Sequence, residues 1–402
     1  GNTPYHTNYH IREPYTIPFR SLYSRNIDNL LFAGRCASFS HFALGTVRVE
    51  RTLATTGQAA GTAAALCIQK NVSPRLLAKE HIGELQQTLL KYDQYIPEVR
   101  NEDPNDLART AHVTASSTAN GLFLKKENVR LSDDRHPLEQ RRAFMMPVTA
   151  GHIESVFLYL RSVRQEPVQM RLHIRGSMAT DDFSSTTDLA VCEAEVKPET
   201  EGWVTFNAGV TINTPYVWVW LEPEKGIEWR LMDSVLPGMQ RAYAKKGTDG
   251  EDIWEKPNGR YACCLEPPAM APQDYAPENV INGVSRIVGD QTNLWSPDPE
   301  AEGPHWIELE FDQPQTFNTI QLTFLTDLDT RNQYPMPRGV ADYDIEIQTD
   351  TGWQKIVSEI NNIQRWRRHV FEDVTSKKIR VTIHNADKID MLGIYEIRVY
   401  RE

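Results

Sequence analysis

The sequence predicts a multidomain, mainly β protein in which a small α-rich segment precedes two antiparallel β-sandwich domains. Apolar residues recur every three or four positions before residue 97, which is the spacing of amphipathic helices. After residue 109 they alternate with polar residues, as in half-buried strands. No helical pattern separates those strands, which favours sandwiches or jelly rolls over a parallel sheet.

The helical patterns lie within residues 1–97. The apolar stretch 30–33 predicts a short strand that ends at Gly34 and Arg35, and the small residues of 52–69 predict a long helix entered through 45–48. Ser73 and Pro74 suit the N-cap and first turn of another helix. One apolar face follows, made by Ile82, Leu85, Leu89, Tyr92 and Ile96. The charged segment 98–108 is predicted to be a linker.

Two stretches of alternating residues come next, 109–266 and 275–402, joined by the proline-rich connector 267–274. Apolar residues alternate within 156–160, 168–174 and 217–221 of the first, and within five runs of the second. Each stretch therefore predicts its own sandwich domain. Trp218 and Trp220 share one face of a predicted strand, where they either form a sugar platform or pack against another domain.

Composition narrows the class of function. With 43 basic and 54 acidic residues the net charge is −11, which argues against a nucleic-acid partner because such proteins carry a basic face. The longest apolar run, 59–68, is far shorter than the roughly 20 residues needed to span a bilayer. Five cysteines fit neither a zinc site nor a disulfide framework. We expect no membrane span.

Residues 9–97 resemble the C-terminal end of FAD-dependent oxidoreductases of the two-dinucleotide-binding-domain type. The similarity runs through IPFRSLYSRNIDNLL, LLFAGRCASFSHFALGTVRVERTLATTGQAAGTAAAL and SPRLLAKEHIGELQQTLLKY. In that family the last helix points its N-terminus at the flavin ring. The resemblance therefore implies cofactor contacts from Gly34, Arg35, Gly45, Thr46, Val47 and Arg48. The alternative is that Arg35 and Arg48 only pair with carboxylates such as Glu50.

The sequence lacks the motif that binds the dinucleotide in that family. That family holds the FAD pyrophosphate on a strand, a GxGxxG turn and a helix, and the 402 residues contain no GxGxxG. We expect the chain to be the C-terminal part of a longer flavoprotein that lacks its N-terminal flavin half. The resemblance then implies FAD in the parent protein, while this chain alone is expected to carry none, to have no catalytic residue and to be inactive.

Residues 275–402 resemble the discoidin, or coagulation-factor C, domains, which have the galactose-binding-like jelly-roll fold. The motifs NVINGVSRIVGDQTNLWSP, WIELEF, YDIEIQTDTGWQKI, HVFEDVTSKKIRVTI and IYEIRVY follow in the family's order. The resemblance implies carbohydrate binding by loops at one end of the sandwich. Aromatic and forked cationic side chains suit sugars, and two loops supply them: Arg331, Tyr334 and Arg338, then Arg365, Trp366 and Arg367. Alternatively, Trp366 packs on a neighbouring domain.

Sugar-binding relatives of this family often hold a structural calcium ion. The resemblance places Asn282, Thr292 and Glu396 at the candidate ligand positions. Asn282 stands where an aspartate is usual, which removes one charge from the site.

Three functions are compatible with these observations. The first is the C-terminal portion of a secreted FAD-dependent oxidoreductase with carbohydrate-binding sandwiches. The second is a non-catalytic polysaccharide-binding protein. The third is an accessory part of a polysaccharide lyase or hydrolase, because proteins of this arrangement are sometimes labelled xanthan lyases. No paired-carboxylate arrangement supports the third. A secreted, periplasmic or cell-surface location is implied by the resemblance alone.

Overall fold

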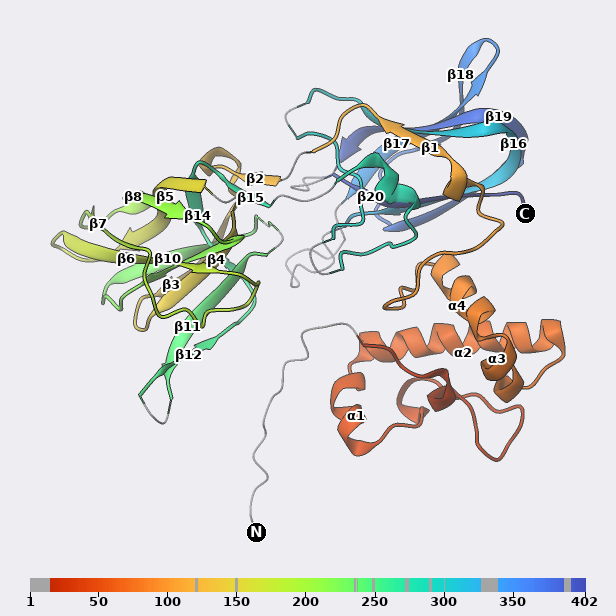
Figure 1. The fold of residues 1–402 in the computed structure, drawn as a ribbon, viewed down its shortest axis with the longest axis horizontal. Helices are drawn as coiled ribbons and strands as arrows, with labels where there is room; N and C mark the ends of the chain where they lie inside the picture. The colour runs from red at the N-terminus through yellow and green to blue at the C-terminus, as the bar shows by residue number, and fades with distance from the viewer. Residues whose placement is uncertain are drawn as a thin grey trace. The chain divides into compact units, whose positions relative to one another are not determined.

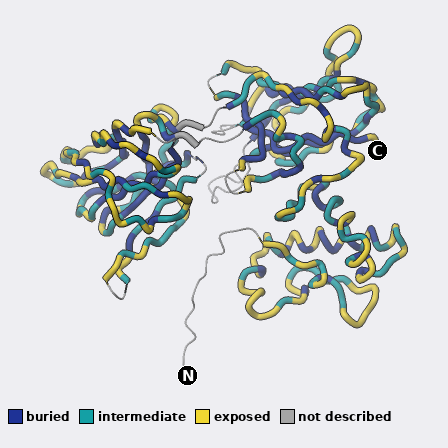
Figure 2. The backbone as a smooth tube through the Cα atoms, viewed as in Figure 1, coloured by how far each residue is buried: buried dark blue, intermediate teal, exposed yellow. Residues whose placement is uncertain are grey.

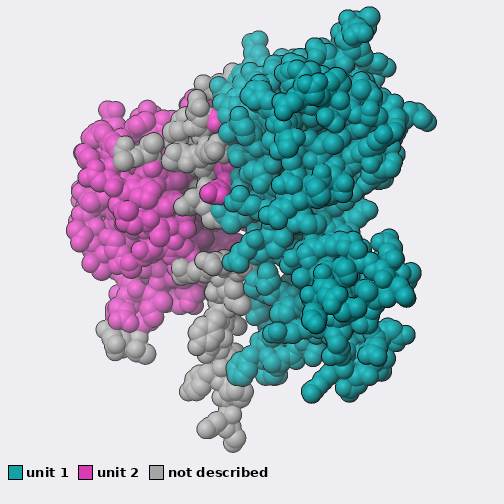
Figure 3. Space-filling model, turned by 45° about the vertical axis from the view of Figure 1, so that its right-hand side comes forward, with its two compact units in different colours: residues 1–118, 276–288, 293–402 teal, residues 119–275, 289–292 magenta. Residues whose placement is uncertain are grey.

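The computed structural model describes residues 15–119, 122–148, 151–234, 236, 238–247, 250–271, 275–288, 291–299, 301–326, 339–386 and 392–402. The chain divides into two compact units (Figure 3). Unit 1 comprises residues 1–118, 276–288 and 293–402, and unit 2 comprises residues 119–275 and 289–292. The strands pair antiparallel in both units, and the α-helices of the described residues lie within 41–91. The predicted fold class is confirmed.

Four helices begin unit 1: α1 (His41–Val47), α2 (Glu50–Lys70), α3 (Pro74–Glu80) and α4 (Ile82–Lys91) (Figure 1). Ser73 caps α3 by accepting a hydrogen bond from the backbone N–H of Leu76, as its position before a proline predicts. The inner faces of the helices share a small core that includes Ala59, Ala63, Leu66, Leu77, Leu85 and Leu89. Their other faces are exposed (Figure 2).

The start of the long helix corrects one prediction. Gly45, Thr46 and Val47 do not begin it, because they lie in the second half of α1, and Arg48 is the C-cap of α1. The Ser40 hydroxyl accepts a hydrogen bond from the N–H of Ala43, so a helix starts earlier and breaks before α2.

The strand predicted at 30–33 is reduced to one antiparallel bridge between Tyr23 and Leu31. A strand exists through hydrogen bonds to its neighbours, and the described residues give this segment that single bridge. The turn that follows, Gly34 and Arg35, is called the flavin-like turn. It is therefore held by a hydrogen bond to α2 and not by a sheet.

Residues 92–106, called the arm below, connect α4 to the sandwich of unit 1. The arm is packed against that sandwich, although part of it is predicted to be a linker. The N–H of Asn101 donates to the carbonyl of Gly283 (2.9 Å), and the N–H of Val399 donates to Asp106 Oδ1 (3.0 Å). Asn101 and Asp106 are each 5% exposed. The helices and the sandwich consequently belong to one unit.

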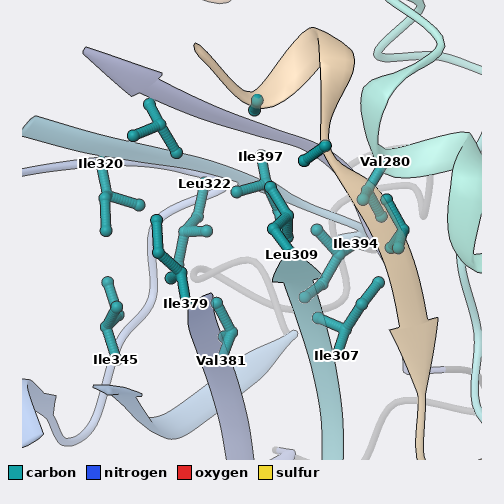
Figure 4. Packing of buried hydrophobic residues seen from close by; sticks show 14 of the residues in the cluster. Val280, Ile307, Leu309, Ile320, Leu322, Ile345, Ile379, Val381, Ile394 and Ile397 are labelled. Carbon is teal, nitrogen blue, oxygen red and sulfur yellow. The ribbon is translucent and has the colours of Figure 1, made fainter. Parts of the chain in front are cut away.

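The sandwich of unit 1 consists of β1 (His112–Ala115), β16 (His305–Phe324), β17 (Val340–Thr349), β18 (Gly352–Glu359), β19 (Trp366–Ala386) and β20 (Ile394–Tyr400). Their order is β1-β16-β19-β17-β18, and β20 pairs with β16. The long strands β16 and β19 pair over their whole lengths with two shifts of register. Alternate residues form the core shown in Figure 4, including Ile307, Leu309, Ile320, Leu322, Ile345, Ile379, Val381, Ile394 and Ile397.

The position of β1 differs from the predicted domain boundary at 109. Its residues His112 to Ala115 pair with Glu310 to Ile307 of β16, so β1 belongs to the last domain and not to the middle one. Unit 2 is thus inserted into the chain of unit 1 after β1. Sequence periodicity shows that a strand is half-buried, but it cannot show which distant strand provides its hydrogen bonds.

Unit 2 is the middle sandwich, with two sheets of six strands. One has the order β13-β10-β5-β14, with β3 beside β10 and β8 beside β5, and the other has the order β12-β11-β4-β9-β6-β7. A small pair, β15-β2, completes it. The strands are β2 (Leu122–Leu124), β3 (Leu131–Pro137), β4 (Arg142–Pro147), β5 (Gly151–Ser162), β6 (Val168–Ser177), β7 (Ala190–Val196), β8 (Glu201–Ile212), β9 (Tyr216–Leu221), β10 (Ile227–Met232), β11 (Gln240–Lys246), β12 (Asp252–Glu255), β13 (Arg260–Tyr261), β14 (Cys263–Glu266) and β15 (Ala269–Ala271).

Candidate functional site

The flavin-like turn is held against α2. Gly34 has a left-handed backbone (φ 61°), and its N–H donates to the hydroxyl of Thr56 on α2 (2.8 Å). A side chain on Gly34 would meet no atom within 4 Å, so the described residues leave the turn open on that side. Arg35 lies 3.8 Å from Glu50, and both side chains are at least 77% exposed. An exposed pair of this kind contributes little stability and leaves Arg35 available to another partner.

A hollow of ≈ 710 Å³ lies beside this turn. It is lined by α2, α4, residues 94–99 of the arm and the segment before α1, including Phe19, Leu22, Thr52, Thr56 and Leu85. Its walls are mainly apolar, and none of these residues supplies the pyrophosphate grip that an FAD site requires. The prediction that the turn at Gly34 and Arg35 contacts a flavin remains untested.

The predicted calcium ligands make other interactions. The side chain of Asn282 donates to Asn279 and Asn293 and accepts from the N–H of Val284. Glu396 is 4% exposed and pairs with Arg398 at 2.9 Å. Among the described residues no group of three or more His, Cys, Asp or Glu side chains could hold a metal ion. Thr292 is also buried, and the second carboxylate oxygen of Glu396, Oε1, has no hydrogen-bond partner among the described residues. The calcium ion at these three residues therefore stays a prediction.

Both predicted sugar-binding loops lie in unit 1. Arg331, Tyr334 and Arg338 fall outside the described residues. Arg365 and Trp366 adjoin the end of α4 and the arm, where the Trp366 ring meets the Tyr92 ring at a centroid distance of 6.0 Å.

Arg365 uses its whole guanidinium within unit 1. It donates to Asp93 Oδ2 (3.1 Å) and to the carbonyls of Phe324 (2.8 Å) and Ser285 (2.5 Å). Arg367 pairs with Glu359. The structure therefore places these side chains in packing and ion-pair contacts, and the prediction that they bind a sugar remains untested.

A second hollow, of ≈ 520 Å³, lies where β16 begins and β19 ends. It is lined by Gly303, Pro304, His305, Ile383, His384, Asn385 and Leu392, and we call it the end hollow. His305 pairs with Ile383, which joins the start of β16 to the end of β19. This pairing sets the position of the residues that line the end hollow. The end hollow is open to solvent and brings His305, His384 and Asn385 next to apolar residues, so polar and apolar groups make up similar shares of its lining.

Burial and neighbouring charges determine the protonation and hydrogen bonding of the polar side chains in the end hollow. Burial lowers the pKa of His305, so this ring is neutral at pH 7, and among the described residues its Nδ1 has no hydrogen-bond partner. His384 Nε2 lies 2.7 Å from Asp344 Oδ2. Burial opposes ionisation of Asp344, but hydrogen bonds from Lys355, Ser358 and His384 outweigh it and lower the pKa. Asn385 donates to Asp342 Oδ2 at 3.3 Å.

Sequence reasoning missed His305, His384 and Asn385. The available signal was weak: each follows or precedes an alternating strand, at the place where the pattern ends. Only the pairing of β16 with β19, about 80 residues apart in sequence, brings the two histidines to one hollow.

Trp218 and Trp220 are buried within unit 2. Trp218 is 0% exposed and contacts Phe183 and Trp254, with ring centroids 5.2 and 5.4 Å away. Trp220 is 4% exposed and stacks on His173 at 3.7 Å. They are covered by their own unit, so they form neither an open sugar platform nor a contact with another domain.

Comparisons with known proteins identify both ends of the chain. Residues 1–89 match the family described as FAD dependent oxidoreductase, and residues 269–397 match the F5/8 type C domain family. Both resemblances deduced from the sequence are confirmed. The second match begins after β1, consistent with an insertion that separates this strand from the rest of its sandwich. No curated protein matches the chain.

Several solved structures resemble about a third of the chain. The family 32 carbohydrate-binding module of Streptococcus pneumoniae EndoD is 15% identical over 32% of this chain and 86% of its own, with a TM-score of 0.25. A module from Clostridium perfringens, CpGH89CBM32-5, solved with GalNAc-β-1,3-galactose, is 14% identical over 32% and 84%, also at 0.25. SpGH29 is 21% identical at the same score, and the match spans 24% of its length.

Among the described residues, no helix is long and apolar enough to cross a membrane.

Proposed function

We propose that this chain is the C-terminal part of a secreted FAD-dependent oxidoreductase and that its unit 1 sandwich binds carbohydrate. The observation that carries the binding role is the match of residues 269–397 to the F5/8 type C family. The match of residues 1–89 supports the oxidoreductase role of the parent protein. Secretion rests on the resemblance to such proteins, and fractionation of the source cells with an antibody to the chain tests it.

FAD would supply hydride transfer in the parent protein. This chain would contribute the wall beside the flavin. The open turn at Gly34 allows a close approach of the backbone to the ring, and Arg35 adds positive charge that favours a reduced, anionic flavin.

The purified chain is expected to carry no stoichiometric flavin, because the pyrophosphate-binding GxGxxG turn is not in its sequence. The visible absorption spectrum after extensive dialysis checks this expectation. The same protein after incubation with excess FAD and a second dialysis serves as the control. A flavin band equivalent to one cofactor per chain in either sample contradicts it.

The end hollow is the proposed sugar site. A pyranose ring presents apolar C–H faces and a rim of hydroxyls. The hollow offers Leu392 for the first, because Ile383 is 2% exposed and belongs to the core, and it offers His305, His384 and Asn385 for the second. Only Nε2 of the neutral His305 ring remains for a hydroxyl group, because Nδ1 is buried, and this single nitrogen either donates or accepts according to the tautomer. The carboxylate of Asp344 orients His384, and that of Asp342 orients Asn385.

Replacing His384 or Asn385 by alanine is expected to weaken glycan binding about tenfold, since one lost hydrogen bond to a ligand corresponds to about 1.4 kcal/mol. A glycan array selects the ligand, and calorimetric titration of the full chain measures the affinity. Lys377→Ala is the matched control, because Lys377 lies on the same strand but pairs with Glu310 on the surface.

Trp366→Ala separates the two candidate positions in unit 1. If the end hollow binds the sugar, this variant keeps its affinity within about threefold, whereas both hollow variants lose theirs. Loss of binding in Trp366→Ala with full binding in the hollow variants would instead assign the site to residues 365–367.

A further inference from the structure

The outer face of one unit 2 sheet carries an aromatic pair. Tyr159 of β5 lies directly opposite Trp203 of β8, with ring centroids 5.3 Å apart and planes at 83°. The strand neighbours of Tyr159, Leu158 and Leu160, are 0% and 1% exposed, so alternation directs Tyr159 away from the core. Tyr159 and Trp203 are only half-buried. Two large rings therefore stand side by side on a face that unit 2 itself leaves partly open.

Charged side chains from three neighbouring strands border this pair. Glu201 of β8 accepts from Arg135 of β3 (3.0 Å) and from Arg230 of β10 (2.7 Å). The Arg230 guanidinium also lies 5.4 Å from the centre of the Tyr159 ring. We call Tyr159, Trp203, Glu201, Arg135 and Arg230 the aromatic face.

The charges of the aromatic face are already balanced. Glu201 and Asp133, which is 3.4 Å from Arg230, oppose the two arginines. A charged ligand would have to break these pairs, whereas a neutral ligand with hydroxyl groups can add hydrogen bonds to them. The pairs also hold the side chains in one arrangement: that of Arg230 is 16% exposed and that of Glu201 is 27% exposed. A preformed site loses little side-chain entropy when it binds.

We propose that the aromatic face is a second carbohydrate-binding site, and that it takes a neutral saccharide chain. The ring of Trp203 covers the apolar face of one sugar, Tyr159 closes the contact from the side, and Glu201 with its arginines meets the hydroxyls. This site lies in unit 2 and is separate from the end hollow. This second-site proposal depends on the proposed function in one respect only, namely that the ligand is a carbohydrate.

The next residue of β5 on the same face of the sheet, Phe157, limits the extent of the aromatic surface. Phe157, two residues before Tyr159, is 8% exposed because Lys126 lies 3.8 Å from the centre of its ring. On these strands the open aromatic surface is thus confined to Tyr159 and Trp203.

Affinity gel electrophoresis of the full chain tests the proposal, with a β-glucan, a galactan and a mannan as the neutral polysaccharides. The background is the double variant His384→Ala and Asn385→Ala, which disables the end hollow. We expect at least one polysaccharide to retard this background, and Trp203→Ala added to it to weaken the binding about tenfold or more.

Two further variants separate stacking from folding. Trp203→Phe keeps an aromatic ring and is expected to retain binding within about fivefold, whereas Thr205→Ala, an exposed neighbour on β8, is expected to leave it unchanged. Glu201→Gln keeps the shape but loses the charge that orders both arginines, and it is expected to weaken binding with little change in melting temperature.

Absence of retardation of the hollow-disabled background by every polysaccharide overturns the second site, while the proposed function stands if the unaltered chain is retarded. Equal retardation of the background with and without Trp203→Ala also overturns it. Loss of all binding in Trp203→Ala alone, with the hollow variants unaffected, supports the aromatic face and refutes the end hollow.

Discussion

Replacing Asp93 by asparagine is expected to lower the free energy of unfolding of unit 1 by about 3 kcal/mol. The Asp93 carboxylate receives Arg286 through Oδ1 and Arg365 through Oδ2, both at 3.1 Å. The side chains of Asp93 and Arg365 are 14% and 11% exposed. Removal of the carboxylate leaves a nearly buried guanidinium without its counter-charge, which costs more than the pair itself contributes.

Burial raises the pKa of Asp93 and Arg286 opposes that rise, so the ion pair offsets part of a real desolvation cost. Asparagine is the suitable replacement because it tolerates the left-handed backbone of this position (φ 58°). Urea unfolding of the full chain measures the effect, and the two units are fitted as separate transitions.

Asp373→Asn provides the matched control. Asp373 pairs with Arg401 at 2.8 Å, but the two side chains are 43% and 64% exposed, so its removal is expected to cost less than about 1 kcal/mol. Equal effects of the two variants would show that the arm does not belong to the cooperative structure of the sandwich.

Acidification from pH 7 to pH 4 is expected to remove about 3 kcal/mol of stability from unit 1 through His369 alone. His369 is 8% exposed, and its Nε2 lies 2.8 Å from the hydroxyl of Tyr343. Burial, with Arg367 as the next cause, lowers its pKa to about 4 from a reference of 6.5. Between these values the unfolded chain binds a proton that the folded chain does not, so stability is complete above pH 6.5 and falls as the pH approaches 4.

His369→Gln tests this source of acid sensitivity. Glutamine can still hydrogen-bond to the Tyr343 hydroxyl but does not titrate, so the stability of the variant is expected to fall less than that of the parent chain between pH 6.5 and pH 4. His112→Gln, which alters an exposed residue of β1, is the control and is expected to follow the parent. Parallel curves for His369→Gln and the parent chain would rule out His369 as the cause.

Local patterns predicted the type of element well. The period of two predicted β16, β17, β19 and β20, and the Ser73–Pro74 pair predicted the start of α3. They failed where two local signals competed: Ser40 starts α1 and displaces the helix start expected at 45–48. The prediction of a strand at 30–33 was wrong because a strand needs hydrogen-bonding partners from another segment, and among the described residues this segment has only the bridge to Tyr23.

The candidate sites were less accessible to sequence reasoning. Arg365 and Trp366 carry the residue types of a sugar site, yet the same types suit an ion pair and an aromatic contact, and the arm supplies partners for both. His305 and His384 showed no motif. Their meeting in the end hollow depends on the register between two strands.

The amino-acid sequence alone determined the mainly β class, the helical start and the two family resemblances, because side-chain periodicity and ordered motifs are properties of neighbouring residues. Tertiary structure decided that β1 joins the last sandwich, that Asn101 and Asp106 of the arm are buried, and that the tryptophans of β9 are covered. Those outcomes depend on which distant surfaces exclude water and satisfy hydrogen bonds together, and residues close in sequence do not encode that choice.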